Sequence, residues 1–162
     1  MRRLLLLAMA TGLTACATQP KQETAPVDAA PLSLIPMPAQ VQRAPGHYRL
    51  DAMTTINVAP GDTQAKHVAA QLQGWIRQAR GITPTIVEGK GKSGISLATV
   101  SSIKGREAYT LDVDANGVRI AANAETGLFY GAVTYWQLLT DPAAQNGVPA
   151  VHIVDAPRFE WR

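Results

Sequence analysis

The sequence feature that most constrains the fold is a pair of alternating segments joined by a short turn. Apolar and polar residues alternate over residues 108–113 and again over residues 118–121. A period of two is typical of β-strands that bury one face. The turn Asp114-Ala115-Asn116-Gly117 lies between them. Asn-Gly is a strong hairpin signal because both residues tolerate positive φ, so the segment predicts an antiparallel hairpin.

Two other segments carry apolar residues at helical spacing. The first follows Asp62, which can cap a helix, and stops at Gly81. The second follows Asn123, which we predict as its N-cap, and its apolar stripe covers residues 128–139. Each segment therefore predicts one amphipathic helix.

Glycines and tryptophans in these helices carry further expectations. Gly127 and Gly131 lie one turn apart and would allow the second helix to approach a sheet closely. Trp75 and Trp136 lie within the two apolar stripes. We therefore expect both tryptophans to be buried in the core.

Short apolar or β-branched runs complete the predicted secondary structure. We expect strands at residues 32–35, 54–58, 83–87, 95–98 and 148–154, and a hairpin over residues 40–50 that turns at Ala44-Pro45-Gly46. Together these elements predict an α+β fold for residues 32–155. In this fold two helices pack on one face of a mostly antiparallel sheet.

The first 31 residues have the pattern of an exported lipoprotein. Arg2 and Arg3 precede a short apolar run that cannot span a bilayer. Leu13-Thr14-Ala15-Cys16 resembles a bacterial lipobox, so we predict a signal peptide at 1–15 and lipidation of Cys16. The alternative is an ordinary signal peptide with an incidental cysteine. Residues 16–31 contain three prolines and predict a flexible tether. By resemblance to proteobacterial lipoproteins, Ala17 after the cysteine favours anchoring in the outer membrane, facing the periplasm.

Charge and motif spacing argue against several classes of function. Removing Arg2 and Arg3 from 15 basic residues leaves 13 against 12 acidic residues, a net charge of +1, so nucleic acid is a poor partner. The three histidines lie far apart in the sequence, and His67 lacks the neighbours of a zinc-protease motif. We predict no cofactor, no metal site and no catalytic residue between positions 32 and 155.

Four passages taken in order resemble a known family. They are I-P-M-P-A-Q-V-Q at 35–42, the hairpin at 107–122, A-E-T-G-L-F-Y-G-A-V-T-Y-W-Q-L-L at 124–139 and I-V-D-A-P-R-F-E-W-R at 153–162. They resemble the N-terminal domain of glycoside hydrolase family 20, the β-N-acetylhexosaminidases or chitobiases. The resemblance implies a zincin-like accessory fold that carries neither metal nor catalytic residues.

The resemblance also implies a second domain on the C-terminal side of this one. Residues 156–162 would begin the catalytic (β/α)₈ barrel, and the chain would be truncated before the rest of it. The family cleaves terminal N-acetylhexosamine from β-linked glycans by substrate-assisted retention, using an adjacent Asp-Glu pair. This sequence contains no such pair. Only Arg162 carries over, as the arginine that hydrogen-bonds hydroxyls of the terminal sugar.

Two interpretations therefore remain. In the first, the chain is the inactive N-terminal part of a β-N-acetylhexosaminidase, with the missing barrel as its intramolecular partner and glycans as partners of the full-length enzyme. In the second, it is a stand-alone lipoprotein module of the same fold, with a binding or scaffold role.

Overall fold

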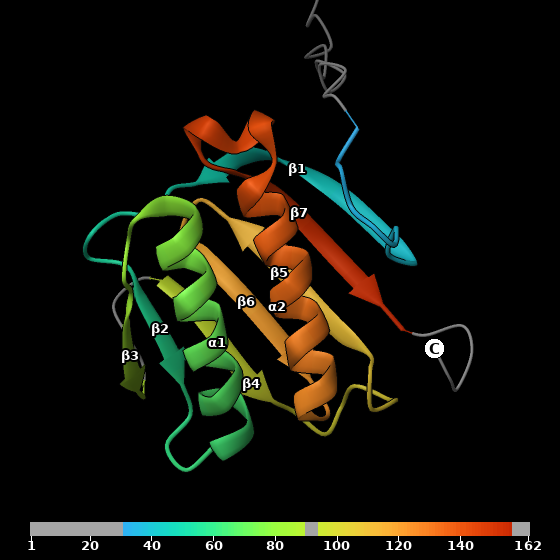
Figure 1. The fold of residues 1–162 in the computed structure, drawn as a ribbon. Coiled ribbons are helices and arrows are strands. Elements are labelled where there is room, and N and C mark those ends of the chain that lie inside the picture. Colours follow the sequence, from blue (N-terminus) through green and yellow to red (C-terminus); the bar gives the residue numbers. More distant parts are fainter. Residues whose placement is uncertain (1–30, 90–93, 157–162) are drawn as a thin grey trace, which may run out of the picture.

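A computed structural model describes residues 31–89 and 94–156 of the chain (Figure 1). The strands are β1 (Gln40–Tyr48), β2 (Thr55–Val58), β3 (Thr85–Glu88), β4 (Gly94–Thr99), β5 (Tyr109–Asp114), β6 (Gly117–Ala122) and β7 (Val148–Asp155). The helices are α1 (Thr63–Arg80), α2 (Glu125–Thr140) and a 3₁₀-helix, η1 (Pro142–Asn146).

The seven strands form one sheet in the order β1-β7-β5-β6-β4-β2-β3, and α1 and α2 cover one of its faces (Figure 1). The predicted α+β class and the placement of two helices on one face are confirmed. The expectation of a mostly antiparallel sheet is wrong for half of it. The pairs β1–β7, β7–β5 and β5–β6 are antiparallel, whereas β6–β4, β4–β2 and β2–β3 are parallel.

The parallel half follows from where the helices lie in the chain. Parallel strands need a crossover connection, and a helix is the usual one. α1 connects β2 to the neighbouring parallel strand β3. α2 connects β6 to β7, which run in the same direction on either side of β5. Strand–helix–strand spacing in the sequence already carried this signal.

Both predicted ends of α1 are confirmed. Asp62 is the N-cap, and its Oδ1 accepts a hydrogen bond from the Ala65 N–H at 2.9 Å. Its Oδ2 accepts from the Thr99 N–H at 2.9 Å, which ties the start of α1 to the end of β4. Burial opposes the charge on Asp62, but these hydrogen bonds outweigh it and hold the pKa of Asp62 below its usual value. At the other end Gly81 adopts φ 69°, the left-handed conformation that glycine favours.

The predicted hairpin of β5 and β6 is confirmed, but the backbone conformation of its turn differs from the expectation. Asp114 pairs with Gly117, so Ala115 and Asn116 form the loop, and neither Asn116 nor Gly117 has positive φ. The Asp114 carboxylate instead accepts hydrogen bonds from the N–H groups of Asn116 and Gly117. Glycine at 117 serves close packing, because a Cβ there would lie 2.5 Å from the Gly94 carbonyl oxygen.

Two predicted elements near the start of the domain are wrong. Residues 32–35 form an irregular segment rather than a strand, with the Leu34 N–H bonded to the Leu32 carbonyl. Residues 40–48 form one strand rather than a hairpin, because β7 is long enough to pair along it. The Ala44-Pro45-Gly46 segment produces an irregularity between Arg43 and His47, where the register with β7 shifts.

The N-terminus of α2 also differs from the expectation. The N-cap is Ala124 instead of Asn123, and its side chain makes no capping hydrogen bond. Gln64 of α1 replaces the missing cap, since its Oε1 accepts from the Glu125 N–H at 2.8 Å. The start of α2 is therefore stabilised by a residue from the other helix.

The close approach of α2 to the sheet is confirmed. A Cβ at Gly127 would lie 2.5 Å from the Ala108 carbonyl oxygen, and one at Gly131 would lie 2.6 Å from Ile120 Cγ2. The core between helices and sheet contains the largest fully buried side chains, among them Ile56, Leu72, Ile76, Ile120, Leu128 and Tyr135.

Candidate functional site

The predicted site residues lie at the two ends of the chain. Cys16, proposed for lipidation, and Arg162, proposed for sugar binding, are both outside the described residues. The aromatic residues Phe159 and Trp161 beside Arg162 are outside them as well. The candidate surfaces therefore lie in the domain between residues 31 and 156.

Histidines and carboxylates of the described domain form separate pairs. The His67 Nδ1 lies 2.5 Å from the Glu125 carboxylate on the helical side, and the His152 Nδ1 lies 2.5 Å from Asp112 on the sheet. Within residues 31–89 and 94–156, no three or more His, Cys, Asp or Glu side chains gather as metal ligands would. In the same ranges, no helix combines the length and apolar character needed to cross a bilayer.

Polar side chains cross the open face of the sheet in one row. In register from β1 to β2 they are Gln42, His152, Asp112, Arg119, Ser96 and Asn57. Asp114, one pleat along from Asp112, accepts a hydrogen bond from Arg119 at 2.9 Å, and this bond holds the pKa of Asp114 below its usual value. The carboxylates of Asp112 and Asp114 pair with His152 and Arg119, and such cross-strand pairs stabilise a solvent-facing side of a sheet.

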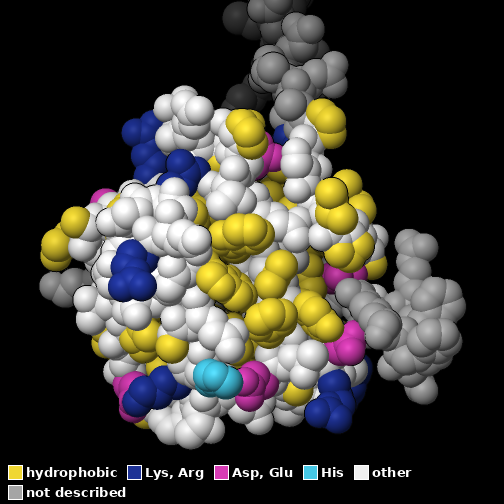
Figure 2. Space-filling model, in the orientation of Figure 1, with side chains coloured by type: hydrophobic (Ala, Val, Ile, Leu, Met, Phe, Trp, Pro, Cys, Tyr) yellow, Lys and Arg dark blue, Asp and Glu magenta, His cyan; other side chains and the backbone are white. Residues whose placement is uncertain are grey.

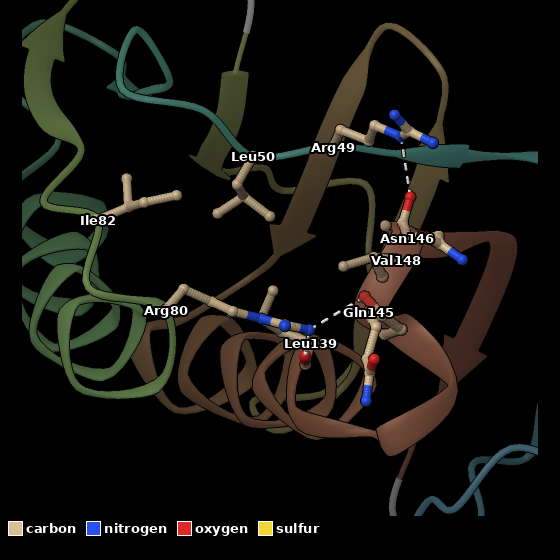
Figure 3. A pocket seen from close by; sticks show the side chains of 10 residues that line it. Arg49, Leu50, Arg80, Ile82, Leu139, Gln145, Asn146 and Val148 are labelled. Carbon is tan, nitrogen blue, oxygen red and sulfur yellow. Dashed lines mark hydrogen bonds between the residues drawn. The ribbon is translucent and has the colours of Figure 1, made fainter.

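A cavity of about 230 Å³ lies where α1 and α2 end beside η1 (Figure 3). Two arginines line it, and each binds backbone carbonyls. The Arg49 Nε donates to the Asn146 carbonyl at 2.9 Å, and the Arg80 guanidinium donates to the carbonyls of Leu139 and Ala144. A cation at the carbonyl end of a helix is stabilising. Among the described residues, no carboxylate lines this cavity, and its two arginines join chain segments through backbone carbonyls.

Aromatic side chains gather on the outer side of the two helices, contrary to the expectation for the tryptophans. Trp136 is 38% exposed, and Trp75 is only partly buried. The ring centroid of Trp75 lies 5.7 Å from that of Phe129 and 6.5 Å from that of Trp136. The ring centroids of Phe129 and Tyr130 lie 5.8 Å apart. Such spacings are typical of interacting aromatic pairs. Figure 2 shows hydrophobic side chains gathered over this face.

The position of Trp136 follows from helix geometry. Leu128, Ala132, Tyr135 and Leu139 of α2 are fully buried against the sheet. Trp136 follows Tyr135 directly, and one residue rotates a helix by about 100°. The ring therefore lies on the outer side of α2, where it meets Trp75 of α1.

A hollow of about 400 Å³ adjoins the aromatic residues. It is lined by Gln64, Gln71, Arg106, Ala124, Glu125, Thr126 and Phe129. The Oε1 atom of Gln71 is buried and has no hydrogen-bond partner. A buried acceptor without a donor is uncommon in folded proteins. The hollow and the aromatic residues together form the candidate interaction surface of the described domain.

The mixed sheet and the two crossover helices that cover one of its faces define an α+β domain. The sequence model described as glycosyl hydrolase family 20, domain 2, matches residues 31–156. The chain therefore belongs to this family, which agrees with the resemblance found in the sequence.

Individual relatives support the same assignment. The chain is 30% identical to a β-hexosaminidase of Vibrio furnissii over 142 residues, covering 88% of this chain and 22% of that protein. A Streptomyces plicatus N-acetyl-β-hexosaminidase, solved with thio-NAglucal, superposes with a TM-score of 0.72 at 34% identity. That match covers 85% of this chain and 29% of the structure.

A Vibrio harveyi exo-β-N-acetylglucosaminidase, at 20% identity and a TM-score of 0.66, shares the fold. It covers 80% of this chain and 20% of that structure. The chain thus spans between about a fifth and three tenths of the length of these relatives.

Proposed function

We propose that this chain is the N-terminal part of a β-N-acetylhexosaminidase that removes terminal N-acetylhexosamine residues from β-linked glycans. The observation that carries the proposal is the family match over residues 31–156. The 34% identity to the Streptomyces plicatus N-acetyl-β-hexosaminidase supports the same activity for the longer protein.

In this proposal the chain itself is not catalytic. Substrate-assisted retention needs a general acid and a carboxylate that orients the substrate's acetamido group. The sequence has no adjacent Asp-Glu pair to provide them, so the pair would come from the barrel that succeeds this domain. Arg162 would contribute hydrogen bonds to hydroxyls of the terminal sugar, because a guanidinium can bind two oxygens at once.

We also propose that Cys16 carries the lipid that anchors the protein to the outer membrane, facing the periplasm. The single cysteine ends the segment Leu13-Thr14-Ala15-Cys16, which resembles a lipobox and follows two arginines and a short apolar run. Several acyl chains would anchor the protein firmly. Expression with a radiolabelled fatty acid tests the proposal: label should enter the wild type and be lost in Cys16→Ser. Label retained in Cys16→Ser would contradict it.

The enzymatic proposal is tested by reading the gene beyond codon 162. The frame should continue through a barrel with an adjacent Asp-Glu pair, and its product should release nitrophenol from a nitrophenyl N-acetylglucosaminide. Replacing the Glu of that pair with Gln is the control, and it should abolish release. A stop codon directly after Arg162, together with a native protein of this mass, would instead favour a stand-alone binding or scaffold module.

A further inference from the structure

Two arginines line the cavity where α1, α2 and η1 end, and neither has an acidic partner. Arg49 directly follows β1, and Arg80 is the last residue of α1. Among the described residues, neither of them forms a salt bridge, whereas Arg119 on the sheet pairs with Asp114. A cation without a counter-charge raises the local concentration of anions. The cavity therefore has the charge expected of an anion-binding site.

Each of the two guanidinium groups keeps free donors after its contacts with the protein. A guanidinium has five N–H donors. Arg49 uses its Nε for the Asn146 carbonyl. Arg80 uses one Nη for the carbonyls of Leu139 and Ala144. The other N–H groups of both side chains have no partner in the described part of the chain. Because the carbonyls hold both side chains in place, the remaining donors are already ordered for a ligand.

Close backbone packing fixes one side of the cavity. A Cβ at Gly147 would lie 2.9 Å from the Tyr48 carbonyl oxygen and 3.1 Å from Arg49 Cγ. Glycine therefore allows the turn after η1 to pack against the end of β1. The exposed amide side chains of Gln145 and Asn146 line the cavity beside Arg49 and add neutral N–H donors (Figure 3).

The helix ends reduce the positive charge of the cavity without cancelling it. α1 and α2 both end here, and their C-termini offset about one of the two arginine charges. Burial raises the pKa of Tyr135 well above its usual value, although Arg80 opposes this, so the Tyr135 hydroxyl stays neutral. Asp141, which precedes η1, lines a different cavity. A net positive charge of about one therefore remains for a ligand.

The walls and the volume of the cavity limit what can bind there. Its apolar walls consist of Leu50, Ile82, Leu139 and Val148 (Figure 3). Apolar walls lower the local dielectric and so strengthen the attraction between opposite charges. The volume of about 230 Å³ lies below the range of about 300–1,000 Å³ that is usual for pockets with drug-sized ligands. The cavity therefore fits a small group rather than a large molecule.

We propose that this cavity binds a small oxyanion, a phosphate or carboxylate group, through the free N–H groups of Arg49 and Arg80. Both anions offer paired oxygens, which a guanidinium binds with two parallel hydrogen bonds. The site is independent of the proposed glycosidase activity, because none of its residues takes part in that activity.

A phosphate has two sources, a free solute and the headgroup of a membrane lipid. The Ser33 N–H donates to the carboxylate of Asp141, the N-cap of η1, so the start of the described chain lies beside η1. The proposed lipid on Cys16 would bring this end of the molecule, and the cavity with it, toward a membrane.

Calorimetric titration of the chain from Ala17 to Arg162 tests the proposal, with inorganic phosphate and, separately, acetate at constant ionic strength. The wild type should bind at least one of the two anions. Arg49→Gln should weaken this binding at least about tenfold, because hydrogen bonds to a charged group are lost. Arg77→Gln is the matched control, since Arg77 lies in the last turn of α1 with Arg80 but does not line the cavity. Its affinity should change less than about twofold.

The arginine Nε–H signals in ¹⁵N NMR give a second readout on the unaltered chain. The Arg80 signal should shift as the anion is added, and the Arg77 signal should not. Binding of neither anion by the wild type would overturn the proposal. Equal weakening by Arg49→Gln and Arg77→Gln, or an Arg80 signal that stays in place, would overturn it as well.

Vesicles of phosphatidylglycerol separate the two sources of phosphate. Sedimentation of the wild type with these vesicles, lost in Arg49→Gln, would assign the cavity to a lipid headgroup. Phosphate or acetate binding in solution without sedimentation would assign it to a soluble anion. Sedimentation that is equal in the wild type and Arg49→Gln, with neither anion bound in solution, would reject the cavity as the site.

Discussion

Asp62 joins two parts of the fold, the start of α1 and the end of β4, through one carboxylate. It caps α1 through Ala65 and binds both the N–H and the hydroxyl of Thr99 at the end of β4. The sequence predicted the cap, because Asp before an apolar helical stripe is a local signal. The bonds to Thr99 depend on the packing of β4 beside α1, which no local pattern contains.

Asp62→Ala should lower the free energy of unfolding by about 1–2 kcal/mol at pH 7, since a lost N-cap costs this much. The pKa of Asp62 is lowered in the folded protein. Its contribution is therefore fully present above the unfolded pKa and is lost as the pH falls through the folded value. Urea unfolding should show the difference between wild type and variant shrinking below about pH 4. Asp62→Asn, which keeps the bond to Ala65, should cost less; equal costs for both variants would contradict the role of the bond to Ala65.

Two helical glycines offer a matched comparison of packing. Gly127→Ala would place a Cβ 2.5 Å from a backbone oxygen, and it should destabilise the fold by about 1–3 kcal/mol. Gly74 of α1 has no atom within 4 Å of such a Cβ, so Gly74→Ala should stabilise by about 0.5–1 kcal/mol. Chemical denaturation measures both. Changes of the same sign would show that helix propensity, rather than contact with the sheet, decides the outcome.

At the scale of elements, the structure separates the features that local sequence determines from those that depend on distant residues. α1 has both end signals in its own sequence, Asp62 and Gly81, and both were predicted. The cap of α2 comes from Gln64, 61 positions away, so the prediction of Asn123 was wrong. Trp136 was predicted to be buried because it lies within the apolar stripe of α2, and apolar periodicity alone did not separate it from its buried neighbour Tyr135.

The role of Gln64 can be tested against Asn123, the residue that the local pattern favours as the cap. Gln64→Ala should destabilise the domain by about 0.5–1.5 kcal/mol, because the Glu125 N–H loses its acceptor. Asn123→Ala should have little effect, since Asn123 is exposed and α2 begins without its side chain. Thermal unfolding followed by circular dichroism would compare the two variants. A larger loss in Asn123→Ala would favour Asn123 as the cap after all.

At the scale of the whole molecule, two crossover helices decide the architecture. Within the antiparallel half of the sheet, the pairing of β5 with β6 was predicted from the alternation around residues 108–121. The parallel half was not predicted, because the order of strands depends on how α1 and α2 pass over the sheet. The family was recognised from segments such as the α2 sequence, in which Gly127 and Gly131 leave no room for a Cβ beside the sheet.

The proposal that catalysis belongs to the barrel predicts how residues 17–162 behave alone. Purified residues 17–162 should release no nitrophenol from a nitrophenyl N-acetylglucosaminide, because no adjacent Asp-Glu pair exists in the sequence. A colorimetric assay at high protein concentration measures this, with an active hexosaminidase of the family as the positive control. Turnover that copurifies with the folded domain through several columns would refute the assignment of roles.

The register shift in β1 bears on the self-association of this protein through the edge of its sheet. β1 is a border strand, and its outer row of donors and acceptors faces outward. Pro45 has no N–H to donate, and the kink at residues 43–47 breaks the row into two short stretches. A foreign strand could pair over only part of this edge. The register shift therefore limits strand-to-strand polymerisation of this protein along the β1 edge.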